Sequence, residues 1–198
     1  MAANPWEKIK IESQGVPLSD TEHKVIYPQT LRELPVGEVG ELVVKGPQVM
    51  NGYWNRPVET EEAFVGINGE KWLRTGDIAR IYEEGYEYII DRLKETIKYK
   101  GFSVSPNEIE KLLFTHPNVA DCAVVGKPNS YAGEIPKAFV VRKFGARVTS
   151  EDLVDYVKSR IAEYKWVREV EFVSDIPRTP SGKILRKALV EREKAARK

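Results

Sequence analysis

The chain has 198 residues, of which 41% are hydrophobic and 31% charged, a composition too apolar for a disordered chain. No run approaches the roughly 18 apolar residues that a membrane-spanning helix needs, and the first residues lack the apolar stretch of a secretory signal. The single cysteine, Cys122, excludes an internal disulfide framework, and its apolar neighbours predict a buried thiol. We expect a cytoplasmic protein.

The charges divide the chain into two parts. Residues 1–90 contain 9 Lys and Arg against 15 Asp and Glu, whereas residues 91–198 contain 22 against 15. This asymmetry predicts two domains, of which the basic one faces an anion such as a nucleotide or a phosphorylated carrier. Mutual attraction between the two halves explains the same charges equally well.

The first ninety residues predict short strands separated by turns. The runs 41–45 and 73–81 have the composition of strands, and Gly-Pro, Asn-Gly and Gly-Asp pairs punctuate the region. One short helical turn is predicted at 57–64. The glycine-rich block at 37–54 is interpreted as scaffold, in which glycines set the turns. We expect a β-rich, barrel-like subdomain.

The remainder of the chain mixes helix signals with apolar strands. Residues 105–108, Ser-Pro-Asn-Glu, predict a capping box at the start of a helix that Pro117 ends. Strands are predicted at 119–126, 135–141 and 170–173. The expected architecture is α+β, a central sheet flanked by helices.

Two more helices belong to this second domain. Thr149 is expected to cap the first of them. Its predicted buried stripe, spaced by four residues, consists of Leu153, Val157 and Ile161. A last helix from about residue 184 is predicted to turn three apolar residues inward, Leu185, Ala188 and Leu189.

The run 72–77, Trp-Leu-Arg-Thr-Gly-Asp, places a carboxylate on a tight turn after a strand. Asp77 could accept two hydrogen bonds from a vicinal diol such as that of a ribose. Taken alone, the motif is better explained by an aspartate that ends a strand.

A row of alternating basic residues follows, Arg92, Lys94, Lys98 and Lys100, and one strand would place all four on the same face. Like charges in a row cost stability unless an anion lies against them. Gly101, at the end of the row, would let a ligand approach the backbone. The alternative is a strand edge guarded by lysines against aggregation.

The run 177–184, Pro-Arg-Thr-Pro-Ser-Gly-Lys-Ile, holds Lys183 on a shaped loop before the final helix. Such a loop can present one ammonium to a phosphate on which charge builds up during displacement. The alternative is an ordinary loop with a solvated lysine.

In this order and at this spacing, the clusters resemble the acyl-adenylate-forming superfamily, which includes acyl-CoA synthetases, 4-coumarate–CoA ligases, beetle luciferases and peptide-synthetase adenylation domains. The resemblance runs from about Gly15 to Leu189, and residues 91–102 are most similar to acyl-CoA or aryl-CoA ligases. It implies a reaction in two steps, with Mg²⁺ arriving on ATP. A carboxylate attacks the α-phosphorus of ATP to give acyl-AMP and pyrophosphate, and the thiol of CoA then displaces AMP.

The resemblance implies roles for the motif residues in the first step. Asp77 would hold the ribose hydroxyls, and Arg92 would support that contact. Lys183 would reach the α-phosphate and the carboxylate during adenylation.

The basic row gains roles in the second step. Lys94 would lie at a hinge and, with Lys98, would approach AMP during thioester formation. Lys100 and Gly101 would line the path of CoA.

The implied organisation is a last β subdomain of a large N-terminal domain at 1–90, a hinge at 91–94 and a mobile C-terminal domain at 95–198. The family's phosphate loop, its Tyr-Gly-x-Thr-Glu block and its acyl pocket have no counterpart in these residues. We therefore expect the chain to need a missing N-terminal portion and to be inactive alone. The expected substrates are a fatty or aryl carboxylic acid, ATP and CoA, without a nucleic-acid partner. Apolar surface that the missing portion leaves uncovered could drive homodimerisation.

Two alternatives stay open: a non-catalytic split subunit that completes a separate N-terminal half, and a peptide-synthetase-type adenylation domain. One departure from the family's pattern is Glu87, which stands where an aromatic residue is common and which we expect to be exposed. His23 and His116 are far apart and lack ligand-type neighbours, so no metal site is expected.

Overall fold

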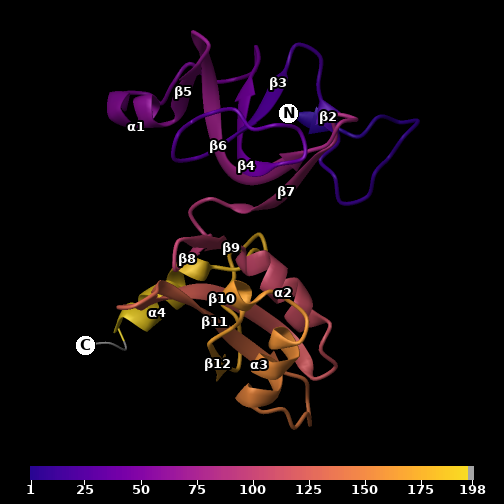
Figure 1. Cartoon of the computed structure of the whole chain (residues 1–198), viewed down its shortest axis with the longest axis vertical. Coiled ribbons are helices and arrows are strands. Elements are labelled where there is room, and N and C mark those ends of the chain that lie inside the picture. Colours follow the sequence, from indigo (N-terminus) through magenta and orange to yellow (C-terminus); the bar gives the residue numbers. More distant parts are fainter. Residues whose placement is uncertain (196–198) are drawn as a thin grey trace. The chain divides into compact units, whose positions relative to one another are not determined.

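The structure, a computed structural model, describes residues 1–195. The chain divides between Lys94 and Glu95 into two compact units (Figure 1). Each unit has its own sheet and its own core. The boundary adjoins the expected hinge at 91–94, whose bending stays a prediction. No helix within residues 1–195 is long and apolar enough to cross a membrane.

The first unit is built on a five-stranded antiparallel sheet. Its strands are β3 (Glu22–Ile26), β4 (Val39–Lys45), β5 (Phe64–Ile67), β6 (Glu70–Ile81) and β7 (Glu87–Arg92). The long strand β6 pairs with β5 through its first residues and with β7 through its last. A short pair, β1 (Ala2–Ala3) with β2 (Val16–Pro17), and one helix, α1 (Pro57–Glu62), complete the unit.

Buried side chains lie on both faces of this sheet, because successive side chains of β4 point to opposite faces. Val43 packs with Trp72, which is fully buried, in one cluster, whereas Leu42 and Val44 pack with Ala79 in another. The predicted β-rich, barrel-like subdomain is confirmed.

The second unit has a sheet in the order β10-β11-β8-β9, with β12 parallel to β11. Its strands are β8 (Ile97–Tyr99), β9 (Phe102–Val104), β10 (Val119–Asn129), β11 (Gly133–Arg142) and β12 (Glu169–Phe172). Its helices are α2 (Pro106–Phe114), α3 (Ser150–Lys158), the 3₁₀ turn η1 (Glu163–Lys165) and α4 (Arg186–Ala195).

Helices cover both faces of this second sheet. Leu113 of α2 and Leu153 of α3 pack in one cluster with Cys122 of β10. Leu189 of α4 packs in another cluster with Ala123, the next residue along β10. Successive residues of a strand point to opposite faces, so α4 lies against the face that α2 and α3 do not cover. The predicted α+β domain and the buried Cys122 are confirmed.

The helix caps follow the sequence signals. Ser105 Oγ accepts a hydrogen bond from the Glu108 amide at 3.3 Å, and Thr149 forms a reciprocal capping box with Asp152. The prediction that Leu185 points inward is wrong, because this side chain is 40% exposed and precedes α4, which begins at Arg186.

The prediction that one strand carries the whole basic row is also wrong. Strand β7 ends at Arg92, a turn that includes Lys94 follows, and Lys98 lies on β8. Lys100 lies in the next turn, with φ of +47°. The turn after Arg92 carries the chain from the first unit into the second. The four cations therefore do not lie on one strand.

Candidate active site

The carboxylate of Asp77 is fixed by Arg92 across the end of two strands. Asp77 of β6 lies directly opposite Arg92 of β7, and Arg92 Nε approaches Asp77 Oδ1 at 2.8 Å. The Asp77 side chain is 20% exposed and that of Arg92 58% exposed, so the pair faces solvent on one side. A carboxylate held in this way can accept hydrogen bonds from a ligand that carries neighbouring hydroxyls.

The prediction that Asp77 lies on a tight turn after a strand is wrong, because Asp77 lies within β6, just after a bulge at Thr75 and Gly76 that shifts the pairing with β4. Thr75 Oγ1 donates to the Leu42 carbonyl at 2.8 Å and accepts from the Asp77 amide at 3.0 Å. Gly76 has φ of +71°, a left-handed conformation that glycine adopts without strain, and its carbonyl accepts from the Leu93 amide at 2.8 Å. The backbone therefore sets the position of the Asp77 carboxylate before any ligand binds.

A pocket of about 200 Å³ lies in the first unit beside this bulge, and Thr75, Asp77, His23 and Glu87 line it. The prediction that Glu87 is exposed is wrong. Glu87 is 4% exposed, and its carboxylate contacts His23 Nδ1, so the histidine has an acidic neighbour. The two residues are 64 positions apart, and no local signal could have linked them.

In the second unit, Lys98, Lys100 and Gly101 lie on one hairpin. Tyr99 pairs with Phe102, which leaves Lys100 and Gly101 as a two-residue turn with φ of +47° and +85°. Two positive φ values are typical of a type I′ turn, which favours glycine. Both lysines are exposed, and Lys98 Nζ donates to Ser103 Oγ at 2.8 Å.

Lys183 is exposed on a short hairpin between β12 and α4. The Thr179 amide donates to the Lys183 carbonyl at 2.8 Å, and the Gly182 amide donates to the Thr179 carbonyl at 2.8 Å. No hydrogen-bond or ion-pair partner of the Lys183 ammonium lies within residues 1–195. Lys94, the expected hinge residue, is likewise exposed. Asp77 and Lys183 belong to different units, and Asp77 of the first unit pairs with Arg92 of the same unit.

Two arginines that flank Lys183 were missed by the sequence analysis. Arg178 contacts both the Gly182 carbonyl and the Asp121 carboxylate of β10. Arg186, at the start of α4, contacts Glu110 of α2 and Glu95, each at 2.7 Å. The Lys183 loop is thus held at both of its ends by ion pairs with distant segments. The basic residues of these pairs stand beside Lys183 in the sequence, but their acidic partners do not.

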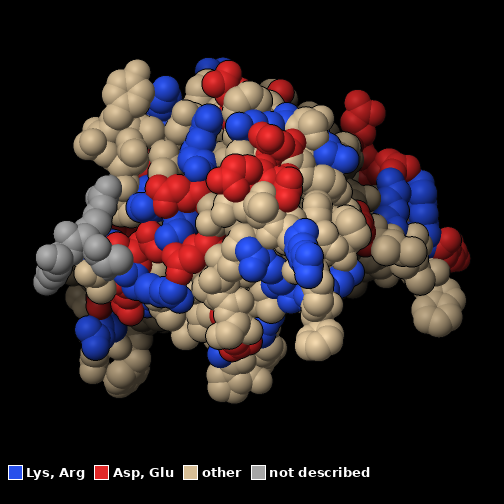
Figure 2. Space-filling view, turned by 90° about the horizontal axis from the view of Figure 1, so that it is seen from below, with Lys and Arg blue, Asp and Glu red and all other residues tan. Residues whose placement is uncertain are grey.

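Charge on the surface is mixed. Figure 2 shows Lys and Arg side chains lying among Asp and Glu side chains on the face drawn. Some basic residues of the second unit pair with acidic residues of the same unit, for example Lys137 with Glu171 and Glu193.

Comparison with known proteins adds two family matches. Residues 1–54 match the family described as "AMP-binding enzyme", and residues 108–183 match "AMP-binding enzyme C-terminal domain".

Similar proteins agree with these matches. The chain is 45% identical to 4-coumarate–CoA ligase 2 of Nicotiana tabacum over 95% of its own length and 34% of that protein. It superposes on ATP-bound MatB of Rhodopseudomonas palustris with a TM-score of 0.91 at 34% identity, covering 100% of this chain and 39% of that one. For the fatty acyl CoA synthetase of Mycobacterium tuberculosis the TM-score is 0.64 at 40% identity, over 94% and 36% of the two chains. The chain spans about a third of the length of the curated relatives it matches.

Proposed function

Because the chain belongs to the AMP-binding enzyme family of adenylate-forming ligases, we propose that it serves as the C-terminal portion of an AMP-forming acyl-CoA ligase. In the first half-reaction a carboxylate oxygen forms a bond to the α-phosphorus of ATP, and the bond from that phosphorus to the departing pyrophosphate breaks. In the second, the sulfur of CoA forms a bond to the acyl carbon, loses its proton, and AMP leaves.

The observation that carries this proposal is the Asp77 carboxylate, which lies beside a bulge of β6 and is held at 2.8 Å by Arg92 of β7. In the proposed role, Asp77 accepts hydrogen bonds from the two ribose hydroxyls of ATP and of acyl-AMP. Arg92 holds the carboxylate in place. The fit is chemical: an anionic acceptor with two oxygens matches a vicinal diol, which is a double donor.

Lys183 is proposed to act in adenylation. An exposed ammonium on a braced loop can stabilise the negative charge that develops on the α-phosphate and the attacking carboxylate. The absence of an acceptor for this ammonium within residues 1–195 leaves it available to an anionic substrate.

The first hairpin of the second unit is proposed to act in thioester formation. Lys98 would approach AMP, while Lys100 and Gly101 would line the path of CoA, where the absence of a side chain at Gly101 admits a close ligand. The Lys183 loop would act in the first step and this hairpin in the second. Rotation of the second unit at Lys94 between the two steps would replace the loop by the hairpin at the substrates. Mg²⁺ would be brought by ATP, since no cluster of potential metal ligands occurs in the part of the chain that is described.

The acid is proposed to be of the aryl or fatty class. The tobacco relative is a ligase of 4-coumarate, an aryl acid, and the mycobacterial structure is that of a fatty acyl CoA synthetase. A cytoplasmic location and a homodimer stay predictions.

The proposal is tested with a chimera in which this chain replaces the matching third of the tobacco ligase. The substrates are 4-coumarate, ATP and CoA, and the release of AMP and pyrophosphate is measured. We expect release by the chimera and none by this chain alone or by the remaining tobacco portion alone. Mixing the two pieces as separate proteins shows whether the chain can also act as a split subunit.

Lys183→Ala in the chimera is expected to lower adenylation about 10²- to 10³-fold, the usual cost of removing one electrostatic donor. The native tobacco ligase provides the activity reference. A folded chimera without activity, or a chimera whose adenylation does not depend on Lys183, would contradict the proposal.

A further inference from the structure

The loop that carries Lys183 is a small closed hairpin. Arg178 and Ile184 form an antiparallel bridge, and the Leu185 amide donates to the Pro177 carbonyl at 2.8 Å. Gly182, at the tip, has φ of +81°, so the direction in which the chain enters Lys183 depends on a left-handed residue. Glycine has many accessible conformations, so something outside the tip must select this one.

Arg178 contributes to that selection, together with the hydrogen bonds that Thr179 makes to Gly182 and Lys183. Its Nη1 donates to the Gly182 carbonyl at 2.9 Å, the carbonyl of the peptide bond that joins Gly182 to Lys183. Its Nη2 donates to both carboxylate oxygens of Asp121, at 2.9 and 2.7 Å. One rigid guanidinium thus connects the peptide before Lys183 to a residue of β10, a strand of the central sheet.

Asp121 is itself oriented. Its Oδ1 also accepts from the amide of Cys122, at 2.8 Å, and Cys122 is buried in the core of the unit. The sequence of contacts therefore runs from the core strand, through Asp121 and Arg178, to the backbone at Lys183. Each contact has a length typical of a good hydrogen bond.

The exposure of the ion pair indicates what it contributes. The Arg178 side chain is 40% and that of Asp121 25% exposed, and ion pairs with such access to water stabilise a fold only weakly. Positioning is more demanding, because a displacement of about 1 Å at a reacting group can cost about 10²-fold in rate. Loss of the pair should therefore affect the position of Lys183 far more than the stability of the unit.

We propose that Arg178, clamped by Asp121, is the positioning residue that sets the Lys183 ammonium for adenylation and has no part in thioester formation. This inference rests on the proposed function, since it assigns the brace to the half-reaction in which Lys183 acts. The geometry of the hairpin itself is independent of that function.

The first experiment follows the motion of the loop in the 198-residue chain, without substrates. Backbone ¹⁵N relaxation measures the order parameters of Gly182 and Lys183 in the wild type and in Arg178→Met. We expect the values to fall from about 0.85, typical of a rigid backbone, towards about 0.6. Arg192→Met, which removes an exposed arginine of α4 that pairs with Glu171, is the matched control and should leave the loop unchanged.

The second experiment separates the two half-reactions in the chimera. Adenylation is measured as pyrophosphate release in single turnovers without CoA, and thioester formation is measured from supplied 4-coumaroyl-AMP and CoA. We expect Arg178→Met to lower the adenylation rate constant about 10- to 100-fold at little change in the KM for ATP, with thioester formation within about twofold of the wild type. Arg178→Lys should be intermediate, because one ammonium lacks the planar fork that reaches both acceptors.

A variant pair tests the route through Asp121. Asp121→Asn should lower adenylation less than Arg178→Met, and the double variant should be no worse than Arg178→Met, because both changes break one contact chain. Full additivity would contradict the clamp.

The outcomes distinguish the inference from the function on which it rests. If Lys183→Ala abolishes adenylation and Arg178→Met does not reduce it, the positioning role is wrong and the proposed function stands. Equal loss in both half-reactions, with a lower Tm, would show a merely structural role and overturn the inference. Adenylation that is indifferent to Lys183→Ala would remove the proposed function, while the relaxation experiment would still report on the brace.

Discussion

Arg92, the last residue of β7, lies opposite Asp77 of β6, and the guanidinium Nε lies 2.8 Å from Asp77 Oδ1. The two residues are also tied through the backbone, since Leu93, the next residue after Arg92, donates to the carbonyl of Gly76. The pair lies at the end of the first unit, immediately before the segment that leads to the second. A contact made here would bind a nucleotide close to the expected hinge.

Replacement of Asp77 by Asn should weaken ATP binding in the chimera. Asn keeps the size of the side chain but loses the charge and one of the two acceptor oxygens. A hydrogen bond to a charged group is worth about 1.5–3 kcal/mol, so we expect the KM for ATP to rise about 10- to 100-fold. Initial rates over a range of ATP concentrations measure the effect.

The matched control is Glu83→Gln, which neutralises an exposed carboxylate in the same unit. Its KM for ATP should equal that of the wild type. An unchanged KM in Asp77→Asn would rule out a ribose contact, and a shared rise in both variants would indicate a general effect of charge instead.

The buried pair of His23 and Glu87 leads to a prediction about stability. Both side chains are at most 5% exposed, and His23 Nε2 has no hydrogen-bond partner in the described part of the chain. His23→Leu would leave the Glu87 carboxylate buried without its partner, and such a loss costs about 3–5 kcal/mol in free energy of unfolding. Glu87→Leu should also destabilise, because it leaves the imidazole unpaired.

The double variant His23→Leu with Glu87→Leu should recover most of the loss, since apolar residues that replace a whole buried pair are often neutral or stabilising. Urea titration of the four proteins completes the double-mutant cycle. Losses that simply add would show that the two side chains do not interact.

The predictability of this protein from its sequence differed between local and distant features. The caps at Ser105 and Thr149 were predictable because a cap involves residues three positions apart. Strands β10 and β11 were predictable because each contains an apolar run. The apolar neighbours of Cys122 also predicted its burial.

Features that depend on tertiary contacts could not be predicted in this way. Glu87 looked exposed because charged residues normally are, and only its pairing with a residue 64 positions away makes its burial tolerable. The basic row had the alternation of a strand, yet the chain turns after Arg92. The partners of Arg178 and Arg186 lie 57 to 91 residues away, beyond any local pattern.

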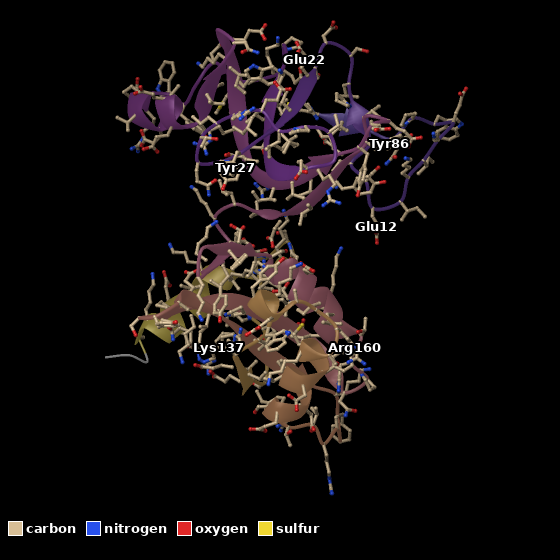
Figure 3. The ribbon with its side chains drawn as sticks, in the orientation of Figure 1. Glu12, Glu22, Tyr27, Tyr86, Lys137 and Arg160 are labelled. Atoms are coloured by element: carbon tan, nitrogen blue, oxygen red, sulfur yellow. The ribbon has the colours of Figure 1, made fainter. Side chains whose placement is uncertain are left out.

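The ionic contacts of Lys137 lead to a prediction about pH. Lys137 of β11, labelled in Figure 3, lies 2.7 Å from Glu171 and 2.6 Å from Glu193, and its side chain is 9% exposed. Burial lowers the pKa of this ammonium, but the hydrogen bonds that it donates to Glu171 and Glu193 outweigh burial and raise the pKa above its usual 10.5. A raised pKa in the folded state means that folding favours the charged lysine.

The sign of the pH dependence follows from this. The stabilisation linked to Lys137 is fully present below pH 10.5 and is lost as the pH rises through the higher pKa of the folded state. Lys137→Met, which leaves Glu193 buried without its main partner, should cost about 3–5 kcal/mol near neutral pH. Lys187→Met, at a lysine that is 84% exposed on α4, is the control and should change stability by at most about 0.5 kcal/mol.

The measurement is the free energy of unfolding of the wild type and the two variants from neutral pH to beyond pH 10.5. The difference between the wild type and Lys137→Met should stay constant up to that pH and shrink above it, because the deprotonated lysine no longer binds the two carboxylates. The difference between the wild type and Lys187→Met should stay small throughout. If the difference in free energy of unfolding between the wild type and Lys137→Met instead shrank only as the pH fell, the carboxylates and not the lysine would govern the pH dependence of this contact.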